Sequence, residues 1–202
     1  MNNKPLSVYK KKKIIEAFCD ELTATQAAHR LNLDRNTINK YFKRIRECIA
    51  GYREYQKMKL VIGMMNTPEK KVNSISKQIP SANAKDQGIP VRIMWLDGQL
   101  LTDMDTQPSG HGSEYMMNVS GYFNGSHNRH DHRKSLHGTD GYDLHQVAND
   151  FHTFAINRFK KFFGIRNEYA YLFVKEAEFL FNEKNALERE KVLNKMIDQI
   201  FL

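Results

Sequence analysis

The sequence predicts a mainly α-helical protein with a three-helix N-terminal domain, an irregular middle and a C-terminal helical part. Residues 1–60 and 143–202 both carry apolar side chains at helical spacing. Residues 61–142 instead hold four of the five prolines and nine of the eleven glycines, without a sustained helical or strand period. These contrasts place the domain boundaries near residues 60 and 142, and predict an irregular segment between them that is either disordered or frameshifted.

Two short helices are expected in the first 31 residues. Ser7 can cap the first helix by accepting a hydrogen bond from its first turn. The apolar positions of that helix share one face and are Ile14, Ile15, Phe18 and Leu22. The second helix is expected from Thr23 to Leu31, where small residues suit close packing of one helix on another.

A third helix is expected from Arg35 to about Ile49, after a tight turn. Asn32, Leu33 and Asp34 form the turn, with Leu33 as an apolar plug and Asp34 as the N-cap. The buried stripe of this helix is expected to consist of Ile38, Tyr41, Phe42, Ile45 and Ile49. A short helix, a turn and a second helix in this order are typical of a helix-turn-helix, whose second helix enters the major groove of DNA.

The distribution of charge agrees with a nucleic-acid partner. Residues 1–60 contain 14 Lys and Arg against 6 Asp and Glu, a net charge of +8 that equals the net charge of the whole chain. A basic domain on a neutral body is typical of proteins that bind polyanions. The alternative explanation of the positive charge is a solvated, lysine-rich first helix. The alternative to a helix-turn-helix is a plain three-helix bundle with a polar face.

Side chains on the second and third helices are expected to bind double-stranded DNA. Asn, Thr and Arg near the start of the third helix can hydrogen-bond to base edges. Later on this helix, Lys43, Arg44 and Arg46 suit contacts with phosphates. The residues expected to bind DNA are Thr25, Gln26, Arg35, Asn36, Thr37, Asn39, Lys40, Lys43 and Arg44.

Three stretches resemble small bacterial insertion-sequence transposases, which join a helix-turn-helix to an RNase H-like catalytic core. Residues 24–42 resemble the N-terminal domain of that family, and residues 154–165 and 171–182 resemble the end of its core. The three stretches together comprise 43 of the 202 residues. The resemblance implies that residues 143–202 are the remnant of an RNase H-like α/β core, and that the ends of an insertion sequence in cytoplasmic, nucleoid-associated DNA are the partner.

The catalytic motifs of that family are incomplete in this sequence. The family's chemistry implies Mg²⁺ ions held by three acidic or equivalent residues for phosphoryl transfer on DNA. No segment resembles the family motif that contains the first metal-binding carboxylate. Asp140 resembles the second carboxylate but lies closer to the C-terminal motif than in the family. Asn149 occupies the position of the third carboxylate. A frameshift or an internal deletion would explain this pattern. The expected function is that of a DNA-binding transposase defective in catalysis, with Mg²⁺ only if the core is active; the alternative is a non-enzymatic regulator derived from one.

The remaining signals are weaker. Seven of the eight histidines lie between His111 and His152, but without cysteines nearby they predict exposed histidines rather than a metal site. Cys19 and Cys48 each lie in an apolar helical stripe. They are therefore expected to be reduced core residues that form no disulfide. No apolar run approaches the roughly 20 residues that span a membrane. The last stretch places its apolar residues on one face, a candidate docking or homodimer surface formed by Leu187, Leu193, Met196, Ile197 and Ile200.

Overall fold

The computed structural model describes residues 6–65, 74–79, 89–104, 143–162, 165 and 167–201. This part of the chain has seven helices and three strands, so the expected mainly helical class is confirmed. The helices are α1 (Val8–Cys19), α2 (Ala24–Leu31), α3 (Arg35–Met65), α5 (Leu144–Phe159), α6 (Asn167–Asn182), α7 (Ala186–Lys195) and α8 (Ile197–Ile200). The strands are β1 (Ser74–Ile79), β2 (Ile89–Leu96) and β3 (Gln99–Met104).

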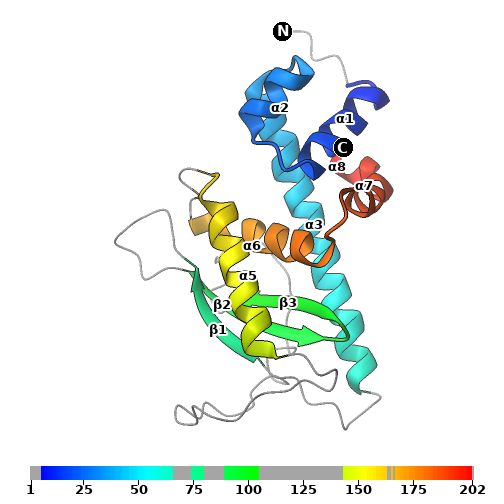
Figure 1. The fold of residues 1–202 in the computed structure, drawn as a ribbon. Coiled ribbons are helices and arrows are strands. Elements are labelled where there is room, and N and C mark those ends of the chain that lie inside the picture. The colour runs from blue at the N-terminus through cyan, green and yellow to red at the C-terminus, as the bar shows by residue number, and fades with distance from the viewer. Residues whose placement is uncertain are drawn as a thin grey trace.

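Helix α3 extends much further than expected and runs from the helical end of the molecule to the sheet (Figure 1). The expected end near Ile49 is wrong, because the helix continues without a break to Met65. Its buried face continues through Arg53, Lys57 and Val61. Because Arg53 and Lys57 are charged, the spacing of apolar residues in the sequence did not show that this face is buried. At 1.5 Å per residue the 31-residue helix is about 46 Å long.

An antiparallel three-stranded sheet occupies part of the segment that was expected to be irregular. Its strands follow one another in the order β1-β2-β3, and the turn between β2 and β3 contains Asp97 and Gly98, both with positive φ. Such a two-residue turn suits the twist of a hairpin. The expectation of an irregular middle is therefore wrong for these strands, while residues 105–142 lie outside the described part.

Both faces of the sheet bury apolar side chains. Val91, Ile93 and Leu100 pack in a core with α5 and α6, whereas Met94 and Leu101 pack in a second cluster with Leu60 of α3. Helix α5 crosses one face of the sheet in Figure 1. A strand that is buried on two sides does not alternate between apolar and polar residues, which is why no strand period was visible in the sequence.

The two ends of the chain form one helical core. Ile14, Phe18 and Phe42 pack in the same cluster as Phe179 and Leu193, so the first 60 residues do not enclose a core of their own. The rings of Phe18 and Phe42 meet edge to face at a centroid distance of 5.2 Å. Aromatic pairs of this geometry add about 0.5–1.5 kcal/mol to the burial of their area.

The C-terminal apolar face belongs to this core rather than to a docking surface. Leu193 and Ile200 are fully buried, and Met196 and Ile197 are partly buried against the same cluster. Of the five residues expected to form a docking surface, Leu187 alone is well exposed, at 65%. The expectation that this face binds a partner is therefore wrong for four of its five residues. None of the described helices is long and apolar enough to cross a membrane.

Candidate nucleic-acid interface

Local hydrogen bonds define both ends of α2. Thr23 and Gln26 form a capping box in which each side chain bonds to the backbone N–H of the other. Asn32 ends the helix in the left-handed conformation, with φ 47° and ψ 54°. Asparagine tolerates this region better than other non-glycine residues, so it can replace the glycine that such turns often contain.

Helix α3 begins directly after this turn. The side chain of Asp34 accepts a hydrogen bond from the Thr37 backbone N–H at 3.1 Å, as expected of an N-cap. Leu33 is half-buried against the helical core, which agrees with its expected role as an apolar plug. Together, Asn32, Leu33 and Asp34 join α2 and α3 through a short turn with its caps satisfied.

Residues 35–44 of α3 divide into a buried and an exposed face. Ile38 and Phe42 are fully buried, and Tyr41 is half-buried in the same cluster. The residues predicted to bind DNA lie on the other faces: Arg35, Asn36, Asn39, Lys40 and Lys43 are exposed, and Thr37 and Arg44 are half-buried. This first part of α3 thus presents amide, guanidinium and ammonium groups to the solvent.

An open cleft of about 560 Å³ brings some of the predicted residues together with the corner between α5 and α6. Thr25 of α2 and Arg35 and Asn39 of α3 form one side, and Lys161 and Tyr169 contribute to the other. Asn36, Thr37, Lys40 and Arg44 do not line this cleft. Lys161 is not among the residues that the sequence predicted to bind DNA, because its position beside α3 depends on the tertiary fold.

Two predicted DNA-binding residues have additional roles. Gln26 is exposed, but its side-chain oxygen accepts a hydrogen bond from the Thr23 N–H at 2.9 Å, which leaves only its NH₂ group for a ligand. The ammonium of Lys43 lies 5.0 Å from the centroid of the Tyr169 ring and 3.8 Å from Glu47 Oε1. Both side chains remain accessible, at the edge of the polar face.

Arg46, expected to contact phosphates, is instead part of the interior. Its Nε lies 2.6 Å from Glu176 Oε2, and its guanidinium stacks on the Phe173 ring at 4.3 Å from the centroid. Only 8% of the residue is exposed. Burial alone would raise the pKa of Glu176, but the charges of Arg46 and Arg158 outweigh it and hold that pKa below the ordinary value.

Glu21 ties the loop between α1 and α2 to the C-terminal helices. Its carboxylate lies 2.7 Å from Arg158 Nη1 and 3.0 Å from Arg189 Nη1, and Lys161 Nζ lies 3.7 Å away. Glu21 has a φ of 58°, a conformation that costs energy for a residue with a side chain. These ion pairs hold the loop between α1 and α2 against α5 and α7.

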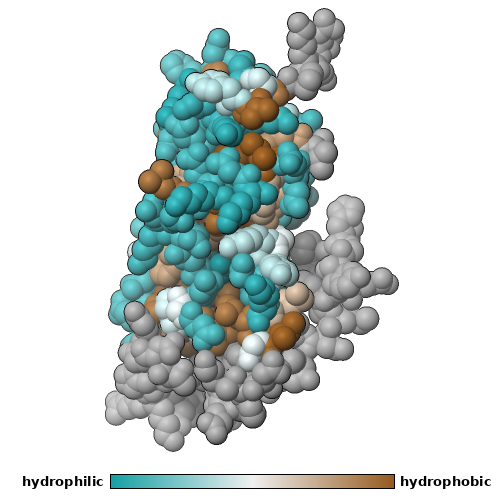
Figure 2. All heavy atoms as spheres, turned by 90° about the vertical axis from the view of Figure 1, so that its right-hand side faces the viewer, coloured by the Kyte–Doolittle hydropathy of each residue, from teal (hydrophilic) through white to brown (hydrophobic). Residues whose placement is uncertain are grey.

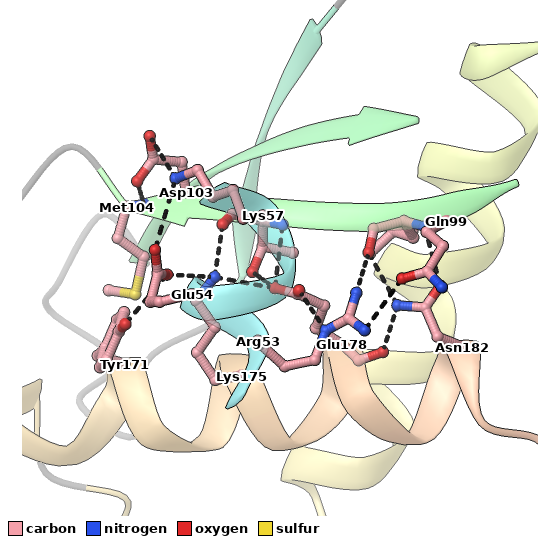
Figure 3. A network of polar contacts seen from close by, with 12 residues as sticks. Arg53, Glu54, Lys57, Gln99, Asp103, Met104, Tyr171, Lys175, Glu178 and Asn182 are labelled. Carbon is pink, nitrogen blue, oxygen red and sulfur yellow. Dashed lines mark hydrogen bonds and ion pairs between the residues drawn. The ribbon is translucent and has the colours of Figure 1, made fainter. Parts of the chain in front are cut away.

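A second buried network fixes the C-terminal half of α3 to α6 and β3 (Figure 3). Glu178 accepts from Arg53 Nε at 2.8 Å and from Lys175 Nζ at 3.0 Å, and it also accepts from the Thr102 hydroxyl and N–H. Lys175 lies 2.7 Å from Glu54. Burial would raise the pKa of Glu178, but the cations Lys175 and Arg53 dominate and lower it.

These carboxylates are arranged as ion-pair partners and do not fit the family's metal ions. In this network Glu54, Asp103 and Glu178 each lie within 4 Å of a lysine or arginine nitrogen, so their charge is already neutralised. No group of three His, Cys, Asp or Glu side chains in the described ranges is placed to hold a metal ion.

Of the positions that resemble the catalytic motifs, Asn149 lies within the described residues. Asn149 is exposed on α5, and its side-chain oxygen accepts a hydrogen bond from Lys77 Nζ at 2.9 Å. Asp140 lies outside the described residues, as do all histidines from His111 to His137.

Comparison of the chain with protein-family models, with curated proteins and with solved structures found no match.

Proposed function

We propose that this chain binds double-stranded DNA, with α2, the turn at Asn32 and α3 as a helix-turn-helix. The observation that carries this proposal is the exposure of polar and basic side chains over the first turns of α3 while its apolar stripe is buried. The major groove of B-DNA is about 12 Å wide and accepts one helix, whose first turns then lie against base edges.

The exposed residues divide into two chemical classes. Arg35 and Asn39 can each form the paired hydrogen bonds that distinguish bases, arginine with guanine and asparagine with adenine. Lys40 and Lys43 lack that planar geometry and suit phosphates, which position the protein without reading sequence. We therefore assign sequence preference to the Arg35–Asn39 side of α3.

The corner between α5 and α6 extends the surface beyond the first 60 residues. Lys161 lies in the same cleft as Arg35 and Asn39, and Lys160 beside it is exposed. A DNA strand that follows α3 would pass this corner, where an ammonium group suits a phosphate. The proposed surface thus joins both ends of the chain.

We further propose that the protein descends from the insertion-sequence transposases but acts without catalysis. The missing first motif and Asn149 at the third position support this, as does the neutralisation of the buried carboxylates by lysine and arginine. The sheet with α5 and α6 is, in this proposal, the remnant of the RNase H-like core. The protein would occupy the ends of an element or regulate transcription on nucleoid DNA in the cytoplasm.

Selection of bound duplexes from a random pool, followed by gel shifts with the full chain, tests the proposal. Arg35→Ala and Asn39→Ala are each expected to weaken binding to the selected duplex about tenfold and to blur the preference. Lys191→Ala is the control, because Lys191 is an exposed lysine of α7 that pairs with Glu188. Failure to enrich any duplex, or unchanged affinity of both α3 variants, would overturn the proposal.

A further inference from the structure

Two aromatic residues at the corner between α5 and α6 lie outside the apolar cores of the protein. Phe162 and Tyr169 are both half-buried, and neither is among the apolar residues that pack into the three described clusters. Both line the cleft of about 560 Å³ that separates this corner from α2 and α3. Part of each ring therefore remains available to a ligand in the cleft.

Cations restrain both rings. The guanidinium carbons of Arg46 and Arg158 lie 5.4 Å and 5.7 Å from the centroid of the Phe162 ring, and the ammonium of Lys43 lies 5.0 Å from that of Tyr169. Both arginines are in turn fixed by buried ion pairs. The attraction between a cation and a ring face limits the positions that the ring adopts. Rings that are ordered in advance lose little entropy when a ligand stacks on them.

The remaining walls of the cleft are polar and positively charged. Arg35 and Asn39 line it from α3, and neither side chain has a hydrogen-bond or ion-pair partner among the described residues. Lys161 is exposed and lies 3.7 Å from Glu21, whose carboxylate is held more closely by two buried arginines at 2.7 Å and 3.0 Å. The charges of Arg35 and Lys161 are therefore available to an anion.

We propose that this cleft binds one unpaired nucleotide of a DNA strand, with its base on the rings of Tyr169 and Phe162 and its phosphate at Lys161. The volume lies in the range of roughly 300–1,000 Å³ that small-molecule sites occupy. An aromatic ring stacks on any base, because every base has a π-face, and a cation attracts the phosphate. The cleft thus combines the two kinds of group by which proteins hold single strands.

The inference deepens the proposed DNA binding and rests on it. Arg35 and Asn39 belong both to the cleft and to the face of α3 that we propose for duplex DNA. A duplex on α3 would therefore bring one strand to the mouth of the cleft. A paired base stacks on its neighbours within the duplex, so only a nucleotide released at an end or at a mismatch can stack on a ring.

Position, and not exposure alone, distinguishes this cleft from other apolar surface. Figure 2 shows the face turned to the right in Figure 1, where hydrophobic patches interrupt a largely hydrophilic surface. The corner between α5 and α6 lies to the left of α3 in Figure 1, below α2. Tyr55 on the C-terminal half of α3 is 53% exposed but lines a different hollow. It provides a matched control for Tyr169.

Fluorescence of 2-aminopurine, a base analogue whose emission falls when it stacks on a ring, tests the inference with the full chain. Three forms of one duplex that the protein binds are compared: a blunt form, a form with one unpaired 2-aminopurine nucleotide at the end, and a form with an abasic unit in that place. The distance between the bound site and the end is varied one base pair at a time. At the matching distance, the form with the unpaired base is expected to lose emission and to bind about tenfold more tightly than the other two.

Removal of a ring should abolish this preference and leave duplex binding unchanged. Tyr169→Ala and Phe162→Leu are expected to bind all three forms with the affinity of the wild type for the blunt duplex, and to leave the emission constant. Tyr169→Phe keeps the ring and should behave as the wild type does. Tyr55→Ala, the control, should also keep the preference. Circular dichroism checks the helix content of each variant.

The other outcomes separate this inference from the proposed function. Equal affinity for the three forms at every distance, with constant emission, overturns the inference and leaves DNA binding by α3 intact. The same loss of emission with free 2-aminopurine mononucleotide, at equal affinity, would overturn the DNA strand as the occupant.

If no duplex binds, the proposed function fails, and a single strand that contains 2-aminopurine then tests the cleft. Emission that stays constant overturns the inference as well. Emission that falls with the wild type but not with Tyr169→Ala supports the cleft as a site for unpaired nucleotides.

Discussion

The guanidinium of Arg46 on α3 lies 2.6 Å from the carboxylate of Glu176 on α6, and both side chains are almost completely withdrawn from solvent. The two residues are 130 positions apart in the sequence. The contact is made one turn beyond Phe42, so it sets the direction of α3 close to the surface that we propose for DNA.

Removal of Arg46 is expected to destabilise the fold without changing the polar face of α3. Arg46→Met leaves the buried Glu176 with Arg158 as its remaining cation, and breaking a buried pair in this way costs about 3 kcal/mol in the free energy of unfolding. Urea denaturation measures this loss. Lys40→Met, an exposed lysine on the same helix, should change stability by less than about 0.5 kcal/mol. Equal losses in the two variants would contradict the structural role of Arg46.

The buried carboxylates predict a loss of stability in acid. The pKa of Glu178 in the folded chain lies below its ordinary value of 4.5, because the charges of Lys175 and Arg53 outweigh burial. Its contribution is therefore present above pH 4.5 and disappears as the pH falls through the lower folded pKa. Thermal melts between pH 7 and pH 3 should show Glu178→Gln melting below the wild type at neutral pH and losing less stability in acid.

An exposed glutamate provides the control for that experiment. Glu188→Gln on α7 removes a carboxylate that forms only a surface pair with Lys191. Its melting curves should follow those of the wild type at every pH, because such pairs contribute little. The same acid profile in Glu178→Gln and the wild type would contradict the assignment.

The conformation of Asn32 predicts a difference between alanine and glycine. At a φ of 47° an alanine side chain costs about 1 kcal/mol, whereas glycine adopts this region without strain. Asn32→Ala should therefore unfold at lower urea concentration than Asn32→Gly, which should lie near the wild type. Equal midpoints would indicate that the turn between α2 and α3 has another shape.

The cleft between α3 and the α5–α6 corner predicts a specific effect of Lys161 on DNA binding. A lysine that contacts one phosphate contributes about one unit to the slope of log affinity against log salt. Lys161→Ala should reduce the slope by about that amount and weaken binding to all duplexes alike. Lys184→Ala, an exposed lysine after α6, is the control and should leave the slope unchanged. A change in sequence preference would instead place Lys161 at base edges.

The sequence predicted those parts of the molecule that depend on local pattern. Ser7 and Asp34 are the caps that were expected, and Ile38, Phe42, Ile45 and Ile49 form the buried stripe of α3 as predicted. The exposure of the proposed DNA-binding residues follows from the same period. These features depend on neighbours within four residues, which the sequence displays directly.

Features that depend on distant partners could not be predicted. Arg46 was predicted to contact DNA phosphates because it follows two other basic residues in the sequence. It is buried instead, because it pairs with Glu176, which is 130 residues away in the sequence. The length of α3 was underestimated because Arg53 and Lys57 are buried charges, compensated by α6 and β3. Lys161 joins the candidate site only through the packing of α5 and α6 beside α3.

The uninterrupted course of α3 makes it a lever arm. The first turns carry the proposed reading surface, and the C-terminal half is held to β3 by Arg53 and Lys57. From Lys57 to Arg35 the helix is about 33 Å long, so a tilt of about 5° at Lys57 moves the first turn by about 3 Å, comparable to the roughly 3.4 Å between successive base pairs. Small rearrangements of the sheet would thus appear at the opposite end as a shift of nearly one step along DNA.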